Sequence, residues 1–287
     1  MFIFQHFLIL TYKEYDIIMK LSKLLNEFIS DCEYKNLSQN TINNYTRVIN
    51  DLIHYVDDIE IEEINNYIIK DYINNLELAT SSKNQYLRCI SSFINYYKYE
   101  YEKDLHVKIR RLKEPREIKY TPTHEEVKKL KDFYNNKTYL MSRNKTIIYT
   151  FINLGLRGSE LLNLKRCDVD LNNNLITIRK RKGNIDQQLP LNKEIKNQLT
   201  KYINRYEIEN EYLFVTRNNN PMNMSDIHYL LHKCNNKINP HSLRRFCCTR
   251  MLLDGVPMVM VSRFMNHNSI ELTNSYYANI KATDIIF

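Results

Sequence analysis

The sequence predicts a mostly helical protein with one small β-sheet, an α+β fold divided into two domains. Three observations lead to this prediction. Apolar residues recur at helical spacing through residues 21–113, a proline-bounded stretch interrupts that pattern, and one later segment changes to the two-residue period of β-strands. The 287 residues suffice for two domains of ordinary size. With 43% hydrophobic and 26% charged residues, the composition is that of a globular protein.

Residues 1–20 are expected to form an extension ahead of the folded part. They open with an apolar run of about ten residues, shorter than the roughly 20 that cross a bilayer. No Lys or Arg precedes this run, so it lacks the charged beginning of a signal peptide. We therefore expect no membrane segment. Met19 stands directly before the first helical pattern, which leaves Met1 and Met19 as alternative start codons.

Residues 21–113 are predicted to form a helical bundle. Apolar side chains mark one face of a first helix from Leu21 onward, at i, i+3, i+4 and i+7. Three further stretches follow the same rule, at 42–56, 64–76 and 87–97. Four helices with short connections are typical of a compact bundle.

Residues 114–122 are predicted to be an extended, basic linker. Pro115 and Pro122 disfavour a helix there. Cations gather just before and within it, at Lys108, Arg110, Arg111, Lys113, Arg116 and Lys119. The whole chain carries 41 Lys and Arg against 33 acidic residues, a formal charge of +8, which favours a polyanionic partner such as nucleic acid. An ordinary solvated linker remains the alternative for this segment alone.

Residues 123–287 are predicted to form the second domain. It opens at Thr123 with a capping box whose glutamate is Glu126. A β-hairpin is expected over 174–191, because two alternating segments flank the turn sequence Lys182-Gly183-Asn184. Helices are expected near 124–134, 143–154, 193–206, 225–236 and 242–254, with a short helix from Pro257 to Asn266.

The remaining composition argues against metal and nucleotide chemistry. The six cysteines form no C-x-x-C pair, and we expect them to be reduced in a cytoplasmic protein. His228 and His232 stand at i, i+4 but lack the H-E-x-x-H pattern and a third ligand, so no metal site is predicted. No phosphate-binding G-x-x-x-x-G-K-[ST] loop occurs, and no cofactor is predicted.

Three separated segments carry the residues that indicate a reaction. They are GLRGSELLNLKRCDVD at 155–170, HSLRRFCCTRML at 241–252 and NHNSIELTNSYY at 266–277. Taken alone, an arginine or histidine in any of these segments would be an ordinary surface or helix-capping residue. Their order and spacing together carry the interpretation.

These segments resemble the motifs of tyrosine recombinases, the phage integrase family that includes Xer-type enzymes. The family pattern runs G-L-R-x-x-E-L, a hairpin lysine, H-x-x-R, G-H, and a tyrosine nine residues after that second histidine. Carried over by position, the resemblance implies six catalytic residues: Arg157, Lys182, His241, Arg244, His267 and Tyr276. Glu160 matches the glutamate that partners the first arginine. The first domain looks like the family's SAM-like core-binding domain, and the second like its catalytic domain.

The resemblance implies a site-specific recombinase that cuts and rejoins DNA through a 3′-phosphotyrosyl intermediate. Tyr276 would attack the phosphate, and the two arginines would neutralise its oxygens. His241 would exchange a proton with the tyrosine, His267 would hydrogen-bond the phosphate, and Lys182 would protonate the leaving 5′-oxygen. The implied partners are double-stranded DNA and further copies of the chain, as a homo-tetramer on paired sites. A second recombinase or an accessory protein remains an option.

The chain departs from the family pattern at a few positions. Asn266 replaces the usual glycine before His267, and asparagine tolerates left-handed backbone better than most residues do. Leu272 replaces a common threonine, and Ile185 and Gln187 replace polar or basic residues after the hairpin lysine.

Alternatives remain open at two levels. Tyr277, adjacent to Tyr276, is the competing nucleophile, although spacing favours Tyr276. Two other functions are compatible with the fold: a non-catalytic DNA-binding protein, and a topoisomerase IB-like enzyme that relaxes DNA. The complete set of six matching residues argues against the first, and a requirement for paired specific sites would argue against the second.

Overall fold

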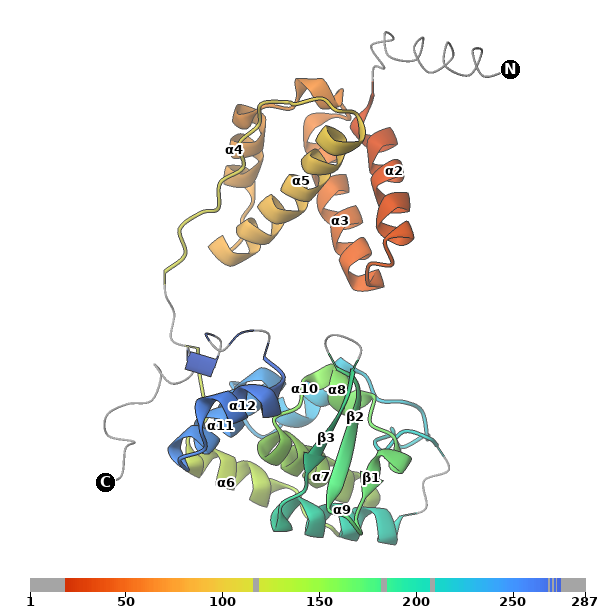
Figure 1. Ribbon diagram of the computed structural model, residues 1–287, viewed down its shortest axis with the longest axis vertical. Helices are drawn as coiled ribbons and strands as arrows, with labels where there is room; N and C mark the ends of the chain where they lie inside the picture. The colour runs from red at the N-terminus through yellow and green to blue at the C-terminus, as the bar shows by residue number, and fades with distance from the viewer. Residues whose placement is uncertain are drawn as a thin grey trace. The chain divides into compact units, whose positions relative to one another are not determined.

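The computed structural model describes residues 19–115, 119–181, 185–206 and 210–267, together with Ser269, Glu271, Thr273 and Asn274 (Figure 1). The described residues form helices and one three-stranded sheet, which confirms the predicted fold class. The chain divides into two compact units between residues 116 and 117, and each is described by itself. The predicted residues Lys182, Tyr276 and Tyr277 lie outside the described residues, as does the extension before Met19.

The first unit is a bundle of four α-helices: α2 (Leu21–Tyr34), α3 (Gln39–Val56), α4 (Asn66–Asn75) and α5 (Thr80–Glu100), with a 3-10 turn at Ile61–Glu63. Ser38 caps α3 by accepting the N–H of Thr41. Ala79 precedes α5, and no side chain caps that helix. Phe28 and Phe93 meet edge to face in the core, at 5.6 Å between ring centroids.

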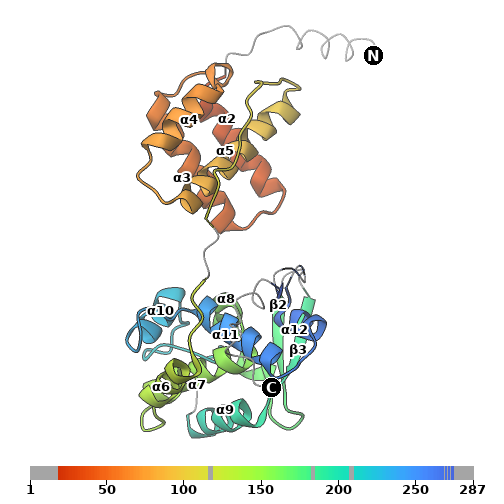
Figure 2. The same ribbon diagram turned by 90° about the vertical axis from the view of Figure 1, so that its left-hand side faces the viewer.

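An extended segment follows α5 and packs back onto the bundle (Figure 2). Leu105, Val107 and Ile109 lie against the core of the first unit, while His106 and Lys108 between them are exposed. This alternation is the two-residue period of extended backbone. Non-helical structure therefore begins well before residue 114, the position at which the prolines predicted the extended linker to begin.

The second unit places a small antiparallel sheet beside a group of helices. The sheet has the order β1 (Val169–Asp170), β2 (Leu175–Arg181) and β3 (Ile185–Pro190). The predicted hairpin is confirmed in β2 and β3, where Leu175 pairs with Pro190 and Ile178 with Gln187. The two-residue strand β1 was not predicted.

The helices of the second unit are α6 (His124–Phe133), α7 (Tyr139–Leu154), α8 (Gly158–Leu162), α9 (Lys193–Arg205), α10 (Met224–His232), α11 (Pro240–Leu253) and α12 (Met258–Met265). Helix α7 is central, since it packs against α6, α9 and α11. It begins at Tyr139 rather than near 143, because Thr138 caps it by accepting the N–H of Met141.

The predicted capping box of this unit is confirmed at the level of hydrogen bonds. Thr123 Oγ1 accepts the N–H of Glu126 at 3.2 Å, and Glu126 Oε2 accepts the N–H of Thr123 at 2.8 Å. The vicinal Cys247 and Cys248 are both fully buried in an apolar cluster with Met265. Within the described ranges, no helix has the length and apolar character needed to cross a bilayer.

Candidate active site

The first motif forms a tight turn between α7 and α8. Gly155 ends α7 in a left-handed conformation with φ 57°, and a side chain built there would come within 2.8 Å of Met265 Sδ. The left-handed backbone therefore favours glycine here, and any Cβ would also displace the flexible end of the Met265 side chain. Arg157 then stands at the start of α8, where Glu160 Oε2 accepts its backbone N–H at 2.8 Å.

Glu160 also joins the two predicted arginines. Its Oε1 lies 2.7 Å from Arg157 Nη1, and its Oε2 lies 3.9 Å from Arg244 Nη1. The carboxylate is almost fully buried, with 7% of its side chain exposed. One buried negative charge thus lies between two guanidinium groups and offsets part of their mutual repulsion.

Helix α11 carries the second motif. Asn239 caps it by accepting the N–H of Ser242, and Pro240 occupies its first turn. His241 and Arg244 are three residues apart and so lie on the same face of this turn. Arg244 is 3% exposed and donates to the carbonyl oxygens of Gly155, at 2.5 Å, and of Met265. These bonds satisfy a guanidinium that would be costly to bury alone.

The third motif begins at the carboxyl end of α12. Asn266 adopts φ 51° and ψ 56°, the left-handed conformation predicted for the position of the family's glycine. Its carbonyl oxygen accepts from Arg157 Nη2 at 3.0 Å. The next residue, His267, donates its backbone N–H to Ser262. The two arginines therefore hold the end of α12 through consecutive carbonyl groups, those of Met265 and Asn266.

The two predicted histidines have different surroundings. Nδ1 of His267 lies 2.7 Å from Oγ1 of Thr273, a residue that is fully buried. His241 is exposed as a residue, yet partial desolvation of its ring lowers its pKa, and nearby cations, first among them Arg244, lower it further. His241 is consequently favoured in its neutral form, which can accept a proton.

The structure brings four predicted residues into one region. Arg157 and Arg244 share Glu160, His241 lies in the same helical turn as Arg244, and His267 follows the α12 end that Arg157 contacts. Lys182 and Tyr276 lie outside the described residues, so their positions are not part of this geometry. Among the described residues, no three His, Cys, Asp or Glu side chains are grouped so that they could hold a metal ion.

Sequence reasoning missed Thr273 as the partner of His267. The residue stands six positions after the histidine, at a spacing that predicts no contact unless the local backbone is known. It also missed that backbone carbonyls at the end of α12 receive the two guanidiniums.

Comparison with known proteins decides the assignment. Residues 121–283 match the phage integrase family, and residues 24–107 match the N-terminal SAM-like domain of phage integrases. The chain belongs to the phage integrase family. This integrase-family chain is thus a tyrosine-type recombinase, an enzyme that breaks and rejoins DNA, as the motifs predicted.

Its relatives include Xer-type recombinases. Tyrosine recombinase XerA of Thermococcus kodakarensis is 26% identical over 262 residues, covering 89% of this chain and 90% of XerA. The Tn1549 transposon integrase, solved with transposon right end DNA, superimposes with a TM-score of 0.73 at 19% identity, over 93% of this chain and 97% of the integrase. A lambda integrase dimer bound to a COC′ core site gives a TM-score of 0.74 at 15% identity, over 90% and 77%. At these identities, the two structures establish the shared fold of the integrase-family chain.

Proposed function

We propose that this chain exchanges DNA strands at specific sites through a 3′-phosphotyrosyl intermediate, with Tyr276 as the nucleophile. One observation carries the proposal: Arg157 and Arg244, from different motifs, meet around the buried carboxylate of Glu160. Two guanidiniums held side by side form a binding site for the non-bridging oxygens of a phosphodiester.

Arg157 is the arginine that would reach a DNA phosphate most directly. Its side chain is 28% exposed, and it donates to Glu160 and to the carbonyl of Asn266. A guanidinium has five N–H groups, so donors remain for a phosphate oxygen. Arg244 is nearly buried and would act through its charge. Such preorganised charge is worth most in the transition state, when the phosphate is most negative.

The proton transfers follow from the remaining residues. The phenol of Tyr276 would attack phosphorus and pass its proton to neutral His241. The bond from phosphorus to the 5′-oxygen would break, and Lys182 would supply the proton that the 5′-oxygen takes up. His267 would donate a hydrogen bond to a non-bridging oxygen. One phosphodiester replaces another, so the 5′-hydroxyl can reverse the step without a metal or a nucleotide.

The proposed assembly is a homo-tetramer on two recombination sites. The support comes from relatives: the solved lambda integrase is a dimer on a core site, and the solved Tn1549 integrase is bound to transposon end DNA. Four copies are the smallest set in which both strands of two duplexes can each meet one tyrosine.

The test is formation of a covalent protein–DNA adduct on a nicked suicide duplex built from DNA that flanks the gene. We expect an adduct on a denaturing gel with wild type and with Tyr277→Phe, and none with Tyr276→Phe. Loss in Tyr277→Phe alone would move the nucleophile by one residue. Specific binding without an adduct would overturn the catalytic assignment, and adducts on any duplex, without paired sites, would indicate a DNA-relaxing enzyme.

A further inference from the structure

Residues 102–115, here called the strap, cross the first unit without forming a helix or strand, and their backbone is left-handed at Glu102 and His106. Leu105, Val107 and Ile109 face the core, and the residues between them face solvent. Successive outward side chains on an extended chain are about 6.6 Å apart, since each residue adds about 3.3 Å. After the left-handed His106, the outward positions carry Lys108 and Arg110, and Arg111 and Lys113 are exposed beyond them, so the strap presents a run of basic side chains.

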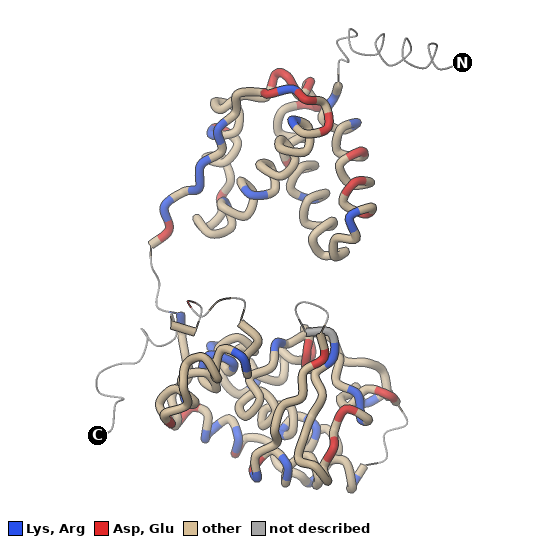
Figure 3. Tube along the Cα trace, viewed as in Figure 1, with Lys and Arg blue, Asp and Glu red and all other residues tan. Residues whose placement is uncertain are grey.

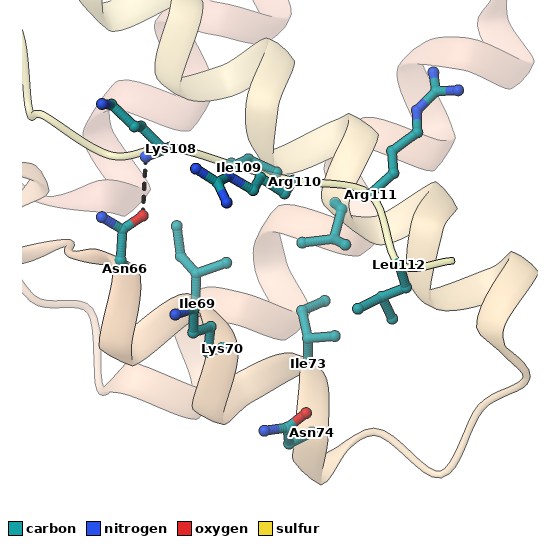
Figure 4. Close-up of a pocket in the computed structure, with 11 residues that line it drawn as sticks. Asn66, Ile69, Lys70, Ile73, Asn74, Lys108, Ile109, Arg110, Arg111 and Leu112 are labelled. Carbon is teal, nitrogen blue, oxygen red and sulfur yellow. Dashed lines mark hydrogen bonds between the residues drawn. The ribbon is translucent and has the colours of Figure 1, made fainter. Parts of the chain in front are cut away.

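Two side-chain amides hold the strap on the helices. Asn66, on α4, accepts the backbone N–H of Lys108 at 2.9 Å (Figure 4). Asn84, on α5, accepts the backbone N–H of Leu112 at 2.8 Å and donates to the carbonyl of the same residue at 3.0 Å. A neighbouring β-strand would offer a peptide the same pair of bonds. Asn84 is only 5% exposed, and an amide buried to that degree is costly unless both its donor and its acceptor are used.

Apolar packing holds this part of the strap only weakly. A cavity of about 430 Å³ lies between the strap and the helices, above Ile69, Ile73 and Leu87 (Figure 4). Leu112, which would be the next apolar anchor, is 39% exposed. The position of residues 110–113 therefore depends on the hydrogen bonds to Asn84 more than on contacts with the core.

Four cations in the later part of the strap form no ion pair among the described residues. Lys108, Arg110, Arg111 and Lys113 are all exposed, and within the described part of the chain none of them is in an ion pair. Figure 3 shows the resulting run of Lys and Arg along the segment. By contrast, Lys98 and Lys103 just before this run are paired with Asp104 and Glu62. Like charges fixed close together repel one another, and a polyanion relieves that repulsion.

We propose that the strap is a track for the phosphates of duplex DNA and that Asn84 is the residue that positions it. The inference rests on the proposed action on DNA and adds a contact surface outside the catalytic unit. Duplex DNA fits better than an acidic peptide, because four exposed cations, Lys108, Arg110, Arg111 and Lys113, dominate this run, and the exposed apolar side chain among them, Leu112, is only 39% exposed. Asn84 itself would touch no DNA; it fixes the register of the cations and so reduces the ordering that binding requires.

The experiment measures how the affinity for a duplex falls with salt, by fluorescence anisotropy with the full chain. Each phosphate contact contributes about 0.9 to the slope of log affinity against log salt concentration. Arg110→Ala with Arg111→Ala should lower the slope by about 1.8. Asn84→Leu removes no charge, yet its slope should also be smaller than that of wild type. The slope of the triple variant, which combines Asn84→Leu with the two arginine substitutions, should be no smaller than that of the arginine double variant.

Matched controls separate positioning from charge and from folding. Lys35→Ala with Lys129→Ala removes the same charge at exposed, already paired lysines whose partners lie outside the strap, and it should leave the slope unchanged. Asn75→Leu removes a side-chain amide on α4 that donates a hydrogen bond to Tyr55 and not to the strap. This variant should also leave the salt slope unchanged. Hydrogen exchange at the Leu112 amide should quicken in Asn84→Leu while the melting temperature of the chain stays near that of wild type.

The outcomes separate this inference from the proposed function. If Asn84→Leu and the arginine double variant both keep the wild-type slope, the strap is not a phosphate track, and the proposed DNA cleavage is unaffected by that result. A wild-type slope in Asn84→Leu alone would overturn the positioning role. If Asn84→Leu fails to fold, Asn66→Ala, which removes only the bond to Lys108 from an exposed side chain, should still lower the slope. No duplex binding by wild type would overturn the proposed function itself.

Discussion

Oγ1 of Thr273 lies 2.7 Å from Nδ1 of His267, and the threonine is fully buried. A hydrogen bond to one ring nitrogen orients a histidine and sets which nitrogen carries the proton. In the proposed mechanism, Thr273 would therefore orient the ring of His267 for its hydrogen bond to the phosphate, a role in which the hydroxyl matters more than the volume of the side chain.

Thr273→Val should slow adduct formation, because it keeps the side-chain volume and removes the hydroxyl. Hydrogen-bond partners of metal-binding histidines contribute roughly 10- to 100-fold to affinity or activity, and we expect the rate of adduct formation to fall on that scale. Thr273→Ser should recover most of the rate. Thr150→Val is the control, since that buried hydroxyl bonds only the carbonyl of Thr146 within its own helix. Equal rates in Thr273→Val and wild type would end the positioning role.

Glu160→Gln should weaken both folding and cleavage. The substitution keeps an acceptor for the backbone of Arg157 but removes the charge between the two guanidiniums. Breaking a buried ion pair costs about 3 kcal/mol of unfolding free energy, and the melting temperature should fall accordingly. Glu125→Gln, at an exposed pair with Lys129, should change neither quantity. A stable Glu160→Gln protein that cleaves at the wild-type rate would contradict the shared carboxylate.

Asn266→Gly should be tolerated, whereas Asn266→Val should reduce cleavage. Glycine and asparagine accept φ 51°, while a β-branched residue is strained there by about 1–2 kcal/mol. A backbone shift at this point would also move the carbonyl that Arg157 contacts. Asn219→Val is the matched control, because Asn219 has φ 57° in a loop outside the site. It should lower stability to a similar extent and leave the cleavage rate of folded protein unchanged.

The acidic limb of the pH–rate profile should lie below the ordinary histidine pKa of about 6.5. Desolvation and the neighbouring cations lower the pKa of His241, so the ring stays neutral to lower pH and can still accept the tyrosine proton. Single-turnover rates at subsaturating protein would report this limb for the free enzyme. His241→Gln should remove the limb, and His228→Gln should leave it in place. A limb above 6.5 would contradict the assignment of His241 as the base.

The same shift predicts how His241 affects stability. Since the folded state favours the neutral ring, its contribution is complete above the unfolded pKa of about 6.5 and is lost as pH falls below that value. Melting temperatures of wild type and His241→Gln should therefore converge or cross as pH is lowered through this range. A difference that grows in favour of wild type at low pH would contradict the direction of the shift.

Much of the local structure follows from neighbours in sequence. Helical periodicity predicted the bundle, the Thr123–Glu126 pair predicted the start of α6, and alternation predicted the β2–β3 hairpin. These features depend on residues a few positions apart, and their hydrogen bonds form within one helix or one hairpin. The order of the motifs likewise predicted the family, because it is a property of the chain alone.

Tertiary structure decided the contacts between distant segments. The carbonyls of Met265 and Asn266 accept hydrogen bonds from Arg244 and Arg157, and Asn84 holds Leu112, which lines the cavity beside α4. No periodicity encodes these pairs, because a backbone carbonyl has no residue identity and an asparagine alone predicts only a cap or a turn. The sequence by itself determined which groups could react. Packing of α7, α11 and α12 determined that the two guanidiniums share one carboxylate, since a buried charge is stable only where its partners converge.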